Sequence, residues 1–124
     1  MLSPFFNEDH ESIREMARDF AEKELAPIAA EIDATEHFPL EVAKTMADLG
    51  FLGLKIPEEY GGLGLDARSY VCVMEEIARK CATATLFISS ANSLSTAPLV
   101  LSGTEEQKEL ILPGVAAGER FIAF

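Results

Sequence analysis

Apolar residues recur every three to four positions along most of this chain, which predicts amphipathic helices. The first such span begins at Asn7 and runs to about Asp33. Its apolar positions are Ile13, Met16, Ala17, Phe20, Leu25, Ile28, Ala29 and Ile32. Pro27 lies inside this span, so the helix either kinks there or is followed by a second short helix.

A second helix is predicted from about Pro39 to Leu49, because proline suits a first helical turn and Gly50 is a natural left-handed terminator. After a glycine-rich loop, Asp66 can cap a third helix that fades near Cys81. The apolar positions of this third helix are Tyr70, Val73, Met74 and Ile77.

A fourth helix, apolar on most sides, is predicted from Thr83 to Leu101. Thr104 and Gln107 form the pattern of a capping box that starts a fifth helix. The pair Pro113-Gly114, and then Gly118, should stop or break it. No useful alternation of period two occurs before residue 119, so the predicted fold class is all-α, an up-down bundle-like helical domain.

The loop from Ile56 to Asp66 carries three glycines and a proline between two helical segments. Glycine permits positive φ angles and close backbone approach, so the loop should be a tight, shaped turn with Leu63 and Leu65 turned inward. A phosphate-binding role is excluded, because the loop lacks a preceding strand and the glycine order of nucleotide-binding motifs.

Length and charge limit the function classes. A chain of 124 residues forms one domain, and its net charge of −11 argues against binding nucleic acid or an anionic membrane surface. The acidic residues are read as solvated helix faces. The run from Ala82 to Leu101 is too polar to span a bilayer and should be a helix buried in protein.

The cysteines and histidines do not form a recognisable metal site. Cys72 and Cys81 are nine positions apart in predicted helix and should be reduced and buried. His10, near a helix start, and His37 suit capping or surface positions. The amino terminus lacks the pattern of a signal peptide, which predicts a cytoplasmic protein, or one in the mitochondrial matrix after processing.

Two pairs of adjacent carboxylates, Glu58-Glu59 and Glu75-Glu76, are candidates for a general acid and a general base. Neighbouring helical residues point about 100° apart, so one member of each pair should face solvent or cap a turn. We therefore interpret both pairs as structural.

Six short stretches, taken together, resemble the acyl-CoA dehydrogenase family and cover nearly the whole chain in the family's order. They are Phe-Ala-Glu-Lys-Glu-Leu-Ala-Pro at 20–27, Phe-Pro at 38–39, Met-Ala-Asp-Leu-Gly-Phe-Leu-Gly at 46–53, the glycine loop at 56–66, Glu-Glu-Ile-Ala-Arg at 75–79 and Gly-Thr-Glu-Glu-Gln-Lys at 103–108. The resemblance favours a continuous, kinked first helix. The stretch from Cys81 to Leu94 looks closest to short-chain, butyryl-type members.

The resemblance implies that residues 1–120 are the family's N-terminal helical domain and that residues 121–124 begin the middle β-domain, where the chain looks cut. The family removes an α-proton and a β-hydride from an acyl-CoA thioester. Its catalytic base and most contacts to the cofactor FAD lie in parts absent here, so no catalytic residue is expected in this chain and the isolated fragment should be inactive.

By the same resemblance, Phe87, Ser90, Ala91 and Leu94 would line the wall of the slot for the acyl tail. A bulky Phe87 would shorten that slot, which suggests a short or branched acyl group. Phe124 aligns with the first residue of the segment that touches the flavin. The full-length enzyme would use an electron-transferring flavoprotein as partner and would form a homo-oligomer, usually a tetramer.

Two alternatives remain at this stage. The same helical domain occurs in acyl-CoA oxidases, nitroalkane oxidases and flavin monooxygenases, which share the fold but not the electron acceptor. The other alternative is a free-standing helical module that binds an acyl chain or a protein partner. Such a module would be expected to have its natural C-terminus at Phe124.

Overall fold

A computed structural model describes residues 4–124, and within that range all regular structure is helical, which confirms the predicted all-α class. The elements are α1 Glu8–Phe20, η1 Ala21–Leu25, α2 Ala29–Thr35, α3 Leu40–Asp48, η2 Glu58–Tyr60, α4 Ala67–Ala78, α5 Ala82–Ser89, η3 Ser90–Leu94, α6 Thr96–Ser102 and α7 Glu105–Ala116. Of the three η elements, η1 and η3 are π-helical turns and η2 is a 3₁₀ turn.

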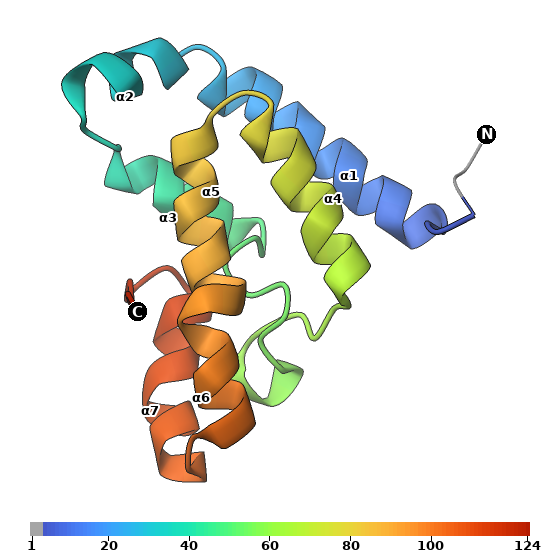
Figure 1. The fold of residues 1–124 in the computed structure, drawn as a ribbon, viewed down its shortest axis with the longest axis vertical. Helices are drawn as coiled ribbons and strands as arrows, with labels where there is room; N and C mark the ends of the chain where they lie inside the picture. The colour runs from blue at the N-terminus through green and yellow to red at the C-terminus, as the bar shows by residue number, and fades with distance from the viewer. Residues whose placement is uncertain (1–3) are drawn as a thin grey trace.

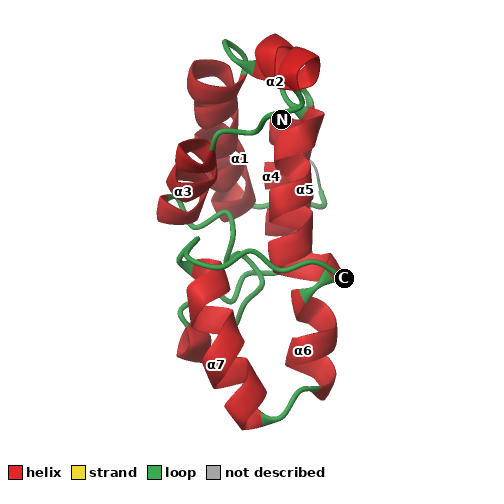
Figure 2. Cartoon of the chain, turned by 90° about the vertical axis from the view of Figure 1, so that its left-hand side faces the viewer, coloured by secondary structure: helices red, strands yellow, loops and turns green. Residues whose placement is uncertain are grey.

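The helices form an elongated body in which α1 packs along α4, and the chain turns back after α4 so that α5 contacts it (Figure 1). Helices α6 and α7 form a hairpin at the opposite end, and the C-terminal segment returns toward α5 (Figures 1 and 2). The non-helical segment 51–56 runs between the two halves, and Phe51, Leu52, Leu54 and Ile56 are almost fully buried there.

The first helical span is divided rather than continuous. Its α-helix ends at Phe20, a π-turn follows, and a second helix begins at Ala29 after Pro27. The N–H of Ala26 donates to the carbonyl of Ala21, five residues back, and the ladder then stops at the proline, which has no N–H to donate. The expectation of one continuous, kinked helix is therefore wrong, and the alternative of a second short helix after Pro27 is the observed one.

The predicted caps are confirmed. The Asp66 carboxylate accepts from the Ser69 amide at 2.9 Å and caps α4, and Thr104 and Gln107 form the reciprocal capping box of α7. Gly50 has a φ of 84° just after α3, as expected of a terminator. Pro39 occupies the N-cap position of α3 instead of its first turn.

The fourth predicted helix is interrupted by the π-turn η3, which separates α5 from α6. In this turn the Ser95 amide donates to the Ser90 carbonyl, so the Ala91 carbonyl loses its usual backbone donor. The hydroxyl of Thr96 donates to that Ala91 carbonyl instead, at 2.7 Å. Among the described residues one run, Ala82–Ser102, is long and apolar enough to cross a membrane by length and composition, although only 28% of its apolar window is buried. By this measure the run is not too polar to span a bilayer, contrary to the expectation from the sequence. The expectation of a buried helix was too strong as well, since Leu86, Leu94 and Leu101 are exposed.

Pro113 does not stop the fifth predicted helix, because α7 continues to Ala116. Both Pro113 and Glu109, whose carbonyl loses its usual donor, are exposed residues, so water can replace the missing bond. The chain reverses at Gly118, which has a φ of 69°. This residue, and not the Pro113-Gly114 pair, ends the helical hairpin.

The glycine loop is tight, but its leucines face outward. Leu63 is 41% exposed and Leu65 is 37% exposed, contrary to the inward orientation expected from the sequence. The backbone determines this outcome, because the amides of Leu63 and Leu65 donate to the carbonyls of Gly53 and Leu54 and lay the loop against the segment 51–56. Breaking these backbone hydrogen bonds to turn the leucine side chains inward would leave buried backbone groups without partners, which is costly.

Asn92 ties this same buried segment to the helices. Its side-chain nitrogen donates to the carbonyls of Phe51 at 2.8 Å and Ile88 at 2.9 Å, and its oxygen accepts from the Lys55 amide at 2.9 Å. Because Asn92 is 2% exposed, water cannot replace these bonds. One amide side chain therefore satisfies three backbone groups, two of which belong to the non-helical segment 51–56.

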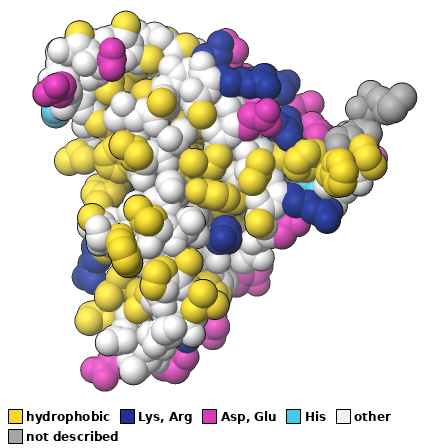
Figure 3. All heavy atoms as spheres, viewed as in Figure 1, with side chains coloured by type: hydrophobic (Ala, Val, Ile, Leu, Met, Phe, Trp, Pro, Cys, Tyr) yellow, Lys and Arg dark blue, Asp and Glu magenta, His cyan; other side chains and the backbone are white. Residues whose placement is uncertain are grey.

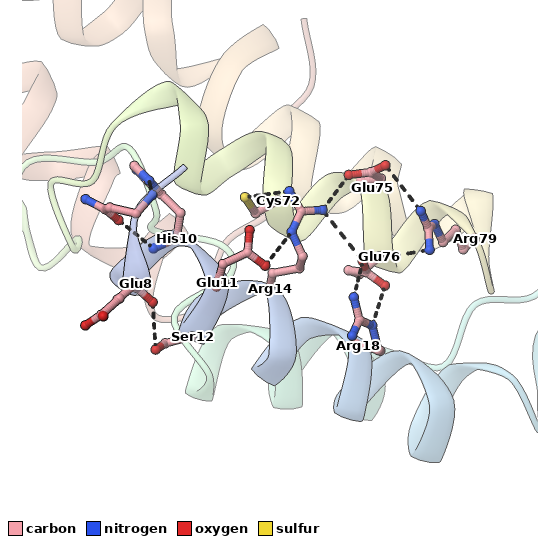
Figure 4. Close-up of polar contacts among 11 residues, drawn as sticks. Glu8, His10, Glu11, Ser12, Arg14, Arg18, Cys72, Glu75, Glu76 and Arg79 are labelled. Atoms are coloured by element: carbon pink, nitrogen blue, oxygen red, sulfur yellow. Dashed lines mark hydrogen bonds and ion pairs between the residues drawn. The ribbon is translucent and has the colours of Figure 1, made fainter. Parts of the chain in front are cut away.

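Charged side chains join α1 to α4 in a row that Figure 4 shows. Arg18 binds the Glu76 carboxylate through two nitrogens at 3.0 and 3.1 Å, and Arg14 binds Glu75 at 2.5 Å. Glu76 is buried and Glu75 is exposed, which agrees with the structural interpretation of this pair. Hydrogen bonds from Arg18 and Arg14, respectively, lower the pKa of Glu76 and of Glu75.

His10 and Asp66 join the N-terminal ends of α1 and α4. The Nδ1 atom of His10 accepts from the Asn7 amide at 3.0 Å, so Nε2 carries the proton and donates to the Asp66 carboxylate at 3.1 Å. The predicted capping role of His10 is confirmed, and His37 lies on the surface as expected. Hydrogen bonds, first from the Ser69 amide and then from His10, lower the pKa of Asp66 to about 2.

This pKa predicts a pH dependence of stability. A carboxylate with a depressed folded pKa stabilises the fold above its unfolded pKa of 3.8, and that contribution is lost as the pH falls toward about 2. Replacing Asp66 with asparagine keeps a capping side chain but removes the charge. Urea unfolding of the D66N chain between pH 5 and about pH 2 should therefore show a shallower loss of stability than the unmodified chain. The exposed Asp33→Asn variant serves as control, and equal slopes for D66N and the unmodified chain would contradict the assignment.

Candidate acyl-binding site

A pocket of about 270 Å³ opens beside α5, between this helix and the C-terminal segment. Its lining residues are Leu52, Leu86, Phe87, Ser90, Ala91, Val115, Arg120, Phe121 and Ile122. Figure 3 shows hydrophobic side chains over α5 and around the C-terminal segment, and further ones elsewhere on this face between scattered charged groups. Apart from Ser90 and Arg120, all the residues that line the pocket are apolar.

The structure brings together three of the four residues predicted for the slot wall. Phe87, Ser90 and Ala91 line the pocket, because they lie where α5 passes into the π-turn η3. Leu94, at the end of the same turn, does not line it and is 56% exposed. The widened turn changes the helical register, so four residues that share a face on a regular helix do not share it here.

Phe87 is held between two other aromatic rings. The ring of Phe38 stacks on it with centroids 4.5 Å apart and an interplanar angle of 30°. The ring of Phe121 meets it edge to face at 5.5 Å and 84°. Phe87 and Phe121 thus form an aromatic corner of the pocket, and both geometries are those that aromatic pairs prefer.

The polar groups at this pocket are engaged within the chain. The Ser90 hydroxyl donates to the carbonyl of Ile122 and also lies 2.9 Å from the Ser95 hydroxyl. The guanidinium of Arg120 donates to the Leu110 carbonyl at 2.9 Å. These bonds fix the C-terminal segment over α5 and leave an apolar interior.

Sequence reasoning missed the contribution of residues 120–122 to this pocket. They belong to no periodic pattern, and only their apolar character at Phe121 and Ile122 signalled a buried or covered position. Leu52 and Val115 were also missed, because they come from a loop and from α7 and meet α5 only in the folded structure.

The glycine loop does not form a cradle for the phosphates of a flavin nucleotide. The five amides from Gly61 to Leu65 all donate to carbonyls of the loop's own neighbourhood, so none is directed at a phosphate. Phe124, which the family resemblance assigns to the flavin, is 91% exposed and does not line the pocket. No step of flavin chemistry can be derived from these residues.

Other reactive groups have structural partners. Tyr60 donates to Glu105 at 2.5 Å, and this bond raises the pKa of Tyr60 to about 12 and lowers that of Glu105. Cys72 and Cys81 are buried and free, as predicted, and burial raises the pKa of the Cys72 thiol. Within residues 4–124 no cluster of histidine, cysteine and carboxylate side chains could hold a metal ion.

Comparison with known proteins identifies the class. The family described as acyl-CoA dehydrogenase, N-terminal domain, matches residues 7–119. The chain therefore belongs to the acyl-CoA dehydrogenase family, and the family resemblance seen in its sequence is confirmed.

Curated relatives share close to half of its residues. A 3-(aryl)acrylate reductase of Clostridium sporogenes is 53% identical over 97% of this chain and 32% of the relative. The caffeyl-CoA reductase-Etf complex subunit CarC of Acetobacterium woodii is 48% identical, again over 97% of this chain and 32% of the relative. A short-chain specific acyl-CoA dehydrogenase of Clostridium acetobutylicum is 43% identical over 94% and 31%. The chain spans about a third of the length of these relatives.

Solved structures share the fold. The butyryl-CoA dehydrogenase of Megasphaera elsdenii aligns with a TM-score of 0.87 at 31% identity and covers 97% of this chain and 32% of its own. A glutaryl-CoA dehydrogenase of Mycobacterium smegmatis, solved in complex with FADH2, gives the same TM-score and identity over 94% of this chain and 30% of its own. The helical arrangement is thus that of the N-terminal domain of this family.

Proposed function

We propose that this chain is the N-terminal domain of a flavin-dependent acyl-CoA dehydrogenase and supplies the wall against which the acyl group of the thioester packs. The observation that carries the proposal is the apolar pocket at Phe87, Ser90 and Ala91, which opens where the family resemblance places the acyl slot. In this view residues 1–120 are the helical domain and residues 121–124 lead into a β-domain.

The chemistry follows from the family. The acyl group loses a proton from its α-carbon to a carboxylate base and a hydride from its β-carbon, so that a C–C double bond forms. FAD supplies the hydride acceptor when it is bound. The residues of this chain bind and orient the acyl group and exclude water from it, since the pocket walls are mainly apolar and the Ser90 hydroxyl is already paired.

No carboxylate of this chain is assigned as the base. The buried Glu76 is held by Arg18 at the α1–α4 interface, and the Glu105 carboxylate accepts from Tyr60. Neither residue lines the pocket. The base and the flavin site are therefore proposed to lie beyond the third of the relatives' length that this chain spans.

The identity of the acyl group is the least specified part of this proposal. The sequence predicts a short or branched group on the ground that Phe87 would shorten the slot, and one relative is named short-chain specific. Two closer relatives are named for arylacrylate and caffeyl-CoA. In the structure Phe87 packs between Phe38 and Phe121 and borders the pocket without filling it.

The proposed partners are inferred from the names of the same relatives. One of them is a subunit of a complex with Etf, which supports an electron-transferring flavoprotein as the electron acceptor of the whole enzyme. We further propose a homo-oligomer, usually a tetramer in this family. The proposed location is the cytoplasm, since the three relatives described above are bacterial, and the alternative is the mitochondrial matrix after processing.

The isolated 124-residue chain tests which part of the function resides in it. Purified with excess FAD and passed through a desalting column, it should retain no flavin, and it should not reduce a dye with butyryl-CoA or 3-phenylpropionyl-CoA. Retained flavin with a protein-shifted absorption spectrum would show that the cofactor site is formed by these residues, and the domain assignment would be wrong.

A further inference from the structure

We propose that the pocket beside α5 selects an apolar aryl group, so that the enzyme's preferred substrate is a 3-phenylpropionyl-type thioester, with Phe87 and Phe121 as the residues that determine this specificity. The inference rests on the proposed function and narrows its substrate class. Three observations carry it: the pocket's volume, the arrangement of its aromatic rings and the state of its polar groups.

The volume exceeds what a short aliphatic group fills. A cavity of about 150 Å³ lined by leucine, isoleucine and phenylalanine holds one benzene molecule, or about 25 Å³ per carbon. By that measure a butyryl group needs about 100 Å³ and a 3-phenylpropionyl group needs about 225 Å³. The pocket of about 270 Å³ matches the larger group and would leave voids around the smaller one.

The rings of Phe87 and Phe121 are set at 84° to each other, and both line the pocket. A flat ring that enters this corner can lie offset over one face and present its edge to the other, which are the two favoured aromatic geometries. Phe38 stacks behind Phe87 and keeps its ring from turning away. An aliphatic chain gains no such directional contact.

The polar groups disfavour hydroxyls on the substrate ring. The Ser90 hydroxyl is engaged with Ile122 and Ser95, whereas Arg120 is an exposed residue that donates one N–H group to Leu110. A ring hydroxyl buried beside Ser90, away from the exposed Arg120, would lack a free partner, and such a group is costly to bury. The pocket therefore favours phenyl over dihydroxyphenyl, as well as phenyl over alkyl.

The test uses the protein encoded by the whole reading frame that contains this chain, with a one-electron dye as acceptor. Each turnover passes two electrons from the Cα–Cβ bond to two dye molecules and releases two protons. We expect kcat/KM for 3-phenylpropionyl-CoA to exceed that for butyryl-CoA and that for 3-(3,4-dihydroxyphenyl)propionyl-CoA by about tenfold or more. Higher kcat/KM for butyryl-CoA, or equal values for the two aryl substrates, would overturn the inference.

Two variants locate the effect. Phe87→Leu keeps an apolar side chain but removes one aromatic face, and it should lower kcat/KM for the phenyl substrate about 3- to 10-fold while changing that for butyryl-CoA less than about twofold. Phe6→Leu, at the start of the chain beside His10 and outside the pocket, should leave the ratio unchanged. Parallel losses on both substrates in F87L would show a structural role only. Activity with none of the three thioesters would instead contradict the proposed function itself.

Discussion

Replacing Gly62 with alanine is expected to lower the free energy of unfolding by about 4 kcal/mol or more. A Cβ built on Gly62 would lie 2.0 Å from the Ile56 carbonyl oxygen and 2.5 Å from its carbon. That carbonyl cannot move aside, because Ile56 is 1% exposed and the carbonyl accepts from the Gly64 amide at 2.9 Å. Since small domains are stable by only about 5–15 kcal/mol, this loss removes a large share of the stability and should lower the urea midpoint well below that of the unmodified chain.

The neighbouring Gly61→Ala variant is a matched control. Its added Cβ would meet no atom within 4 Å, but its φ of 86° is unfavourable for alanine. The expected cost is about 1 kcal/mol from backbone strain alone. Urea unfolding of both variants, monitored by circular dichroism, gives the two free energies of unfolding. Their difference separates the cost of the steric clash at Gly62 from the cost of backbone strain at Gly61. Equal costs at the two positions would show that the close contact of Gly62 with Ile56 is not a feature of the folded chain.

Replacing Asn92 with leucine is expected to cost about 3–4 kcal/mol, the second largest effect. The change keeps the volume and the burial but leaves the carbonyl of Phe51 and the amide of Lys55 without the partners that Asn92 gives them. A buried polar group without a partner costs about 1–3 kcal/mol. Urea unfolding with the linear extrapolation measures the loss directly.

The control for Asn92 is its half-buried neighbour Ser93, where alanine should change the free energy of unfolding by less than about 0.5 kcal/mol. A second readout is hydrogen exchange at the amide of Lys55, which should become faster in N92L while the α1–α4 amides are less affected. If N92L were as stable as the unmodified chain, the three hydrogen bonds of Asn92 would not be what holds the segment 51–56.

Local rules were enough for the starts of α4 and α7. Asp66 and Thr104 accept from amides three residues ahead, and such caps depend only on residues close in sequence. The apolar period likewise located the helices that form the core. The family was recognised because several of these local stretches occur in one order along the chain.

Features that depend on distant contacts were not predictable in the same way. The outward orientation of Leu63 and Leu65 results from backbone bonds to the segment 51–56, and the break in the fourth helix results from a π-turn that periodicity does not reveal. The pocket combines residues of α5, of α7 and of the segment 120–122. Three of its residues were predicted through the family resemblance, whereas the aromatic corner with Phe121 required the structure.

The most direct test of the central claim is to express the whole reading frame that contains this chain and to record its absorption spectrum before and after anaerobic addition of acyl-CoA thioester. We predict a yellow protein with bound FAD whose flavin absorbance is bleached by 3-phenylpropionyl-CoA. A colourless product, or a flavin that no acyl-CoA thioester reduces, would contradict the assignment of this chain to a flavin-dependent acyl-CoA dehydrogenase.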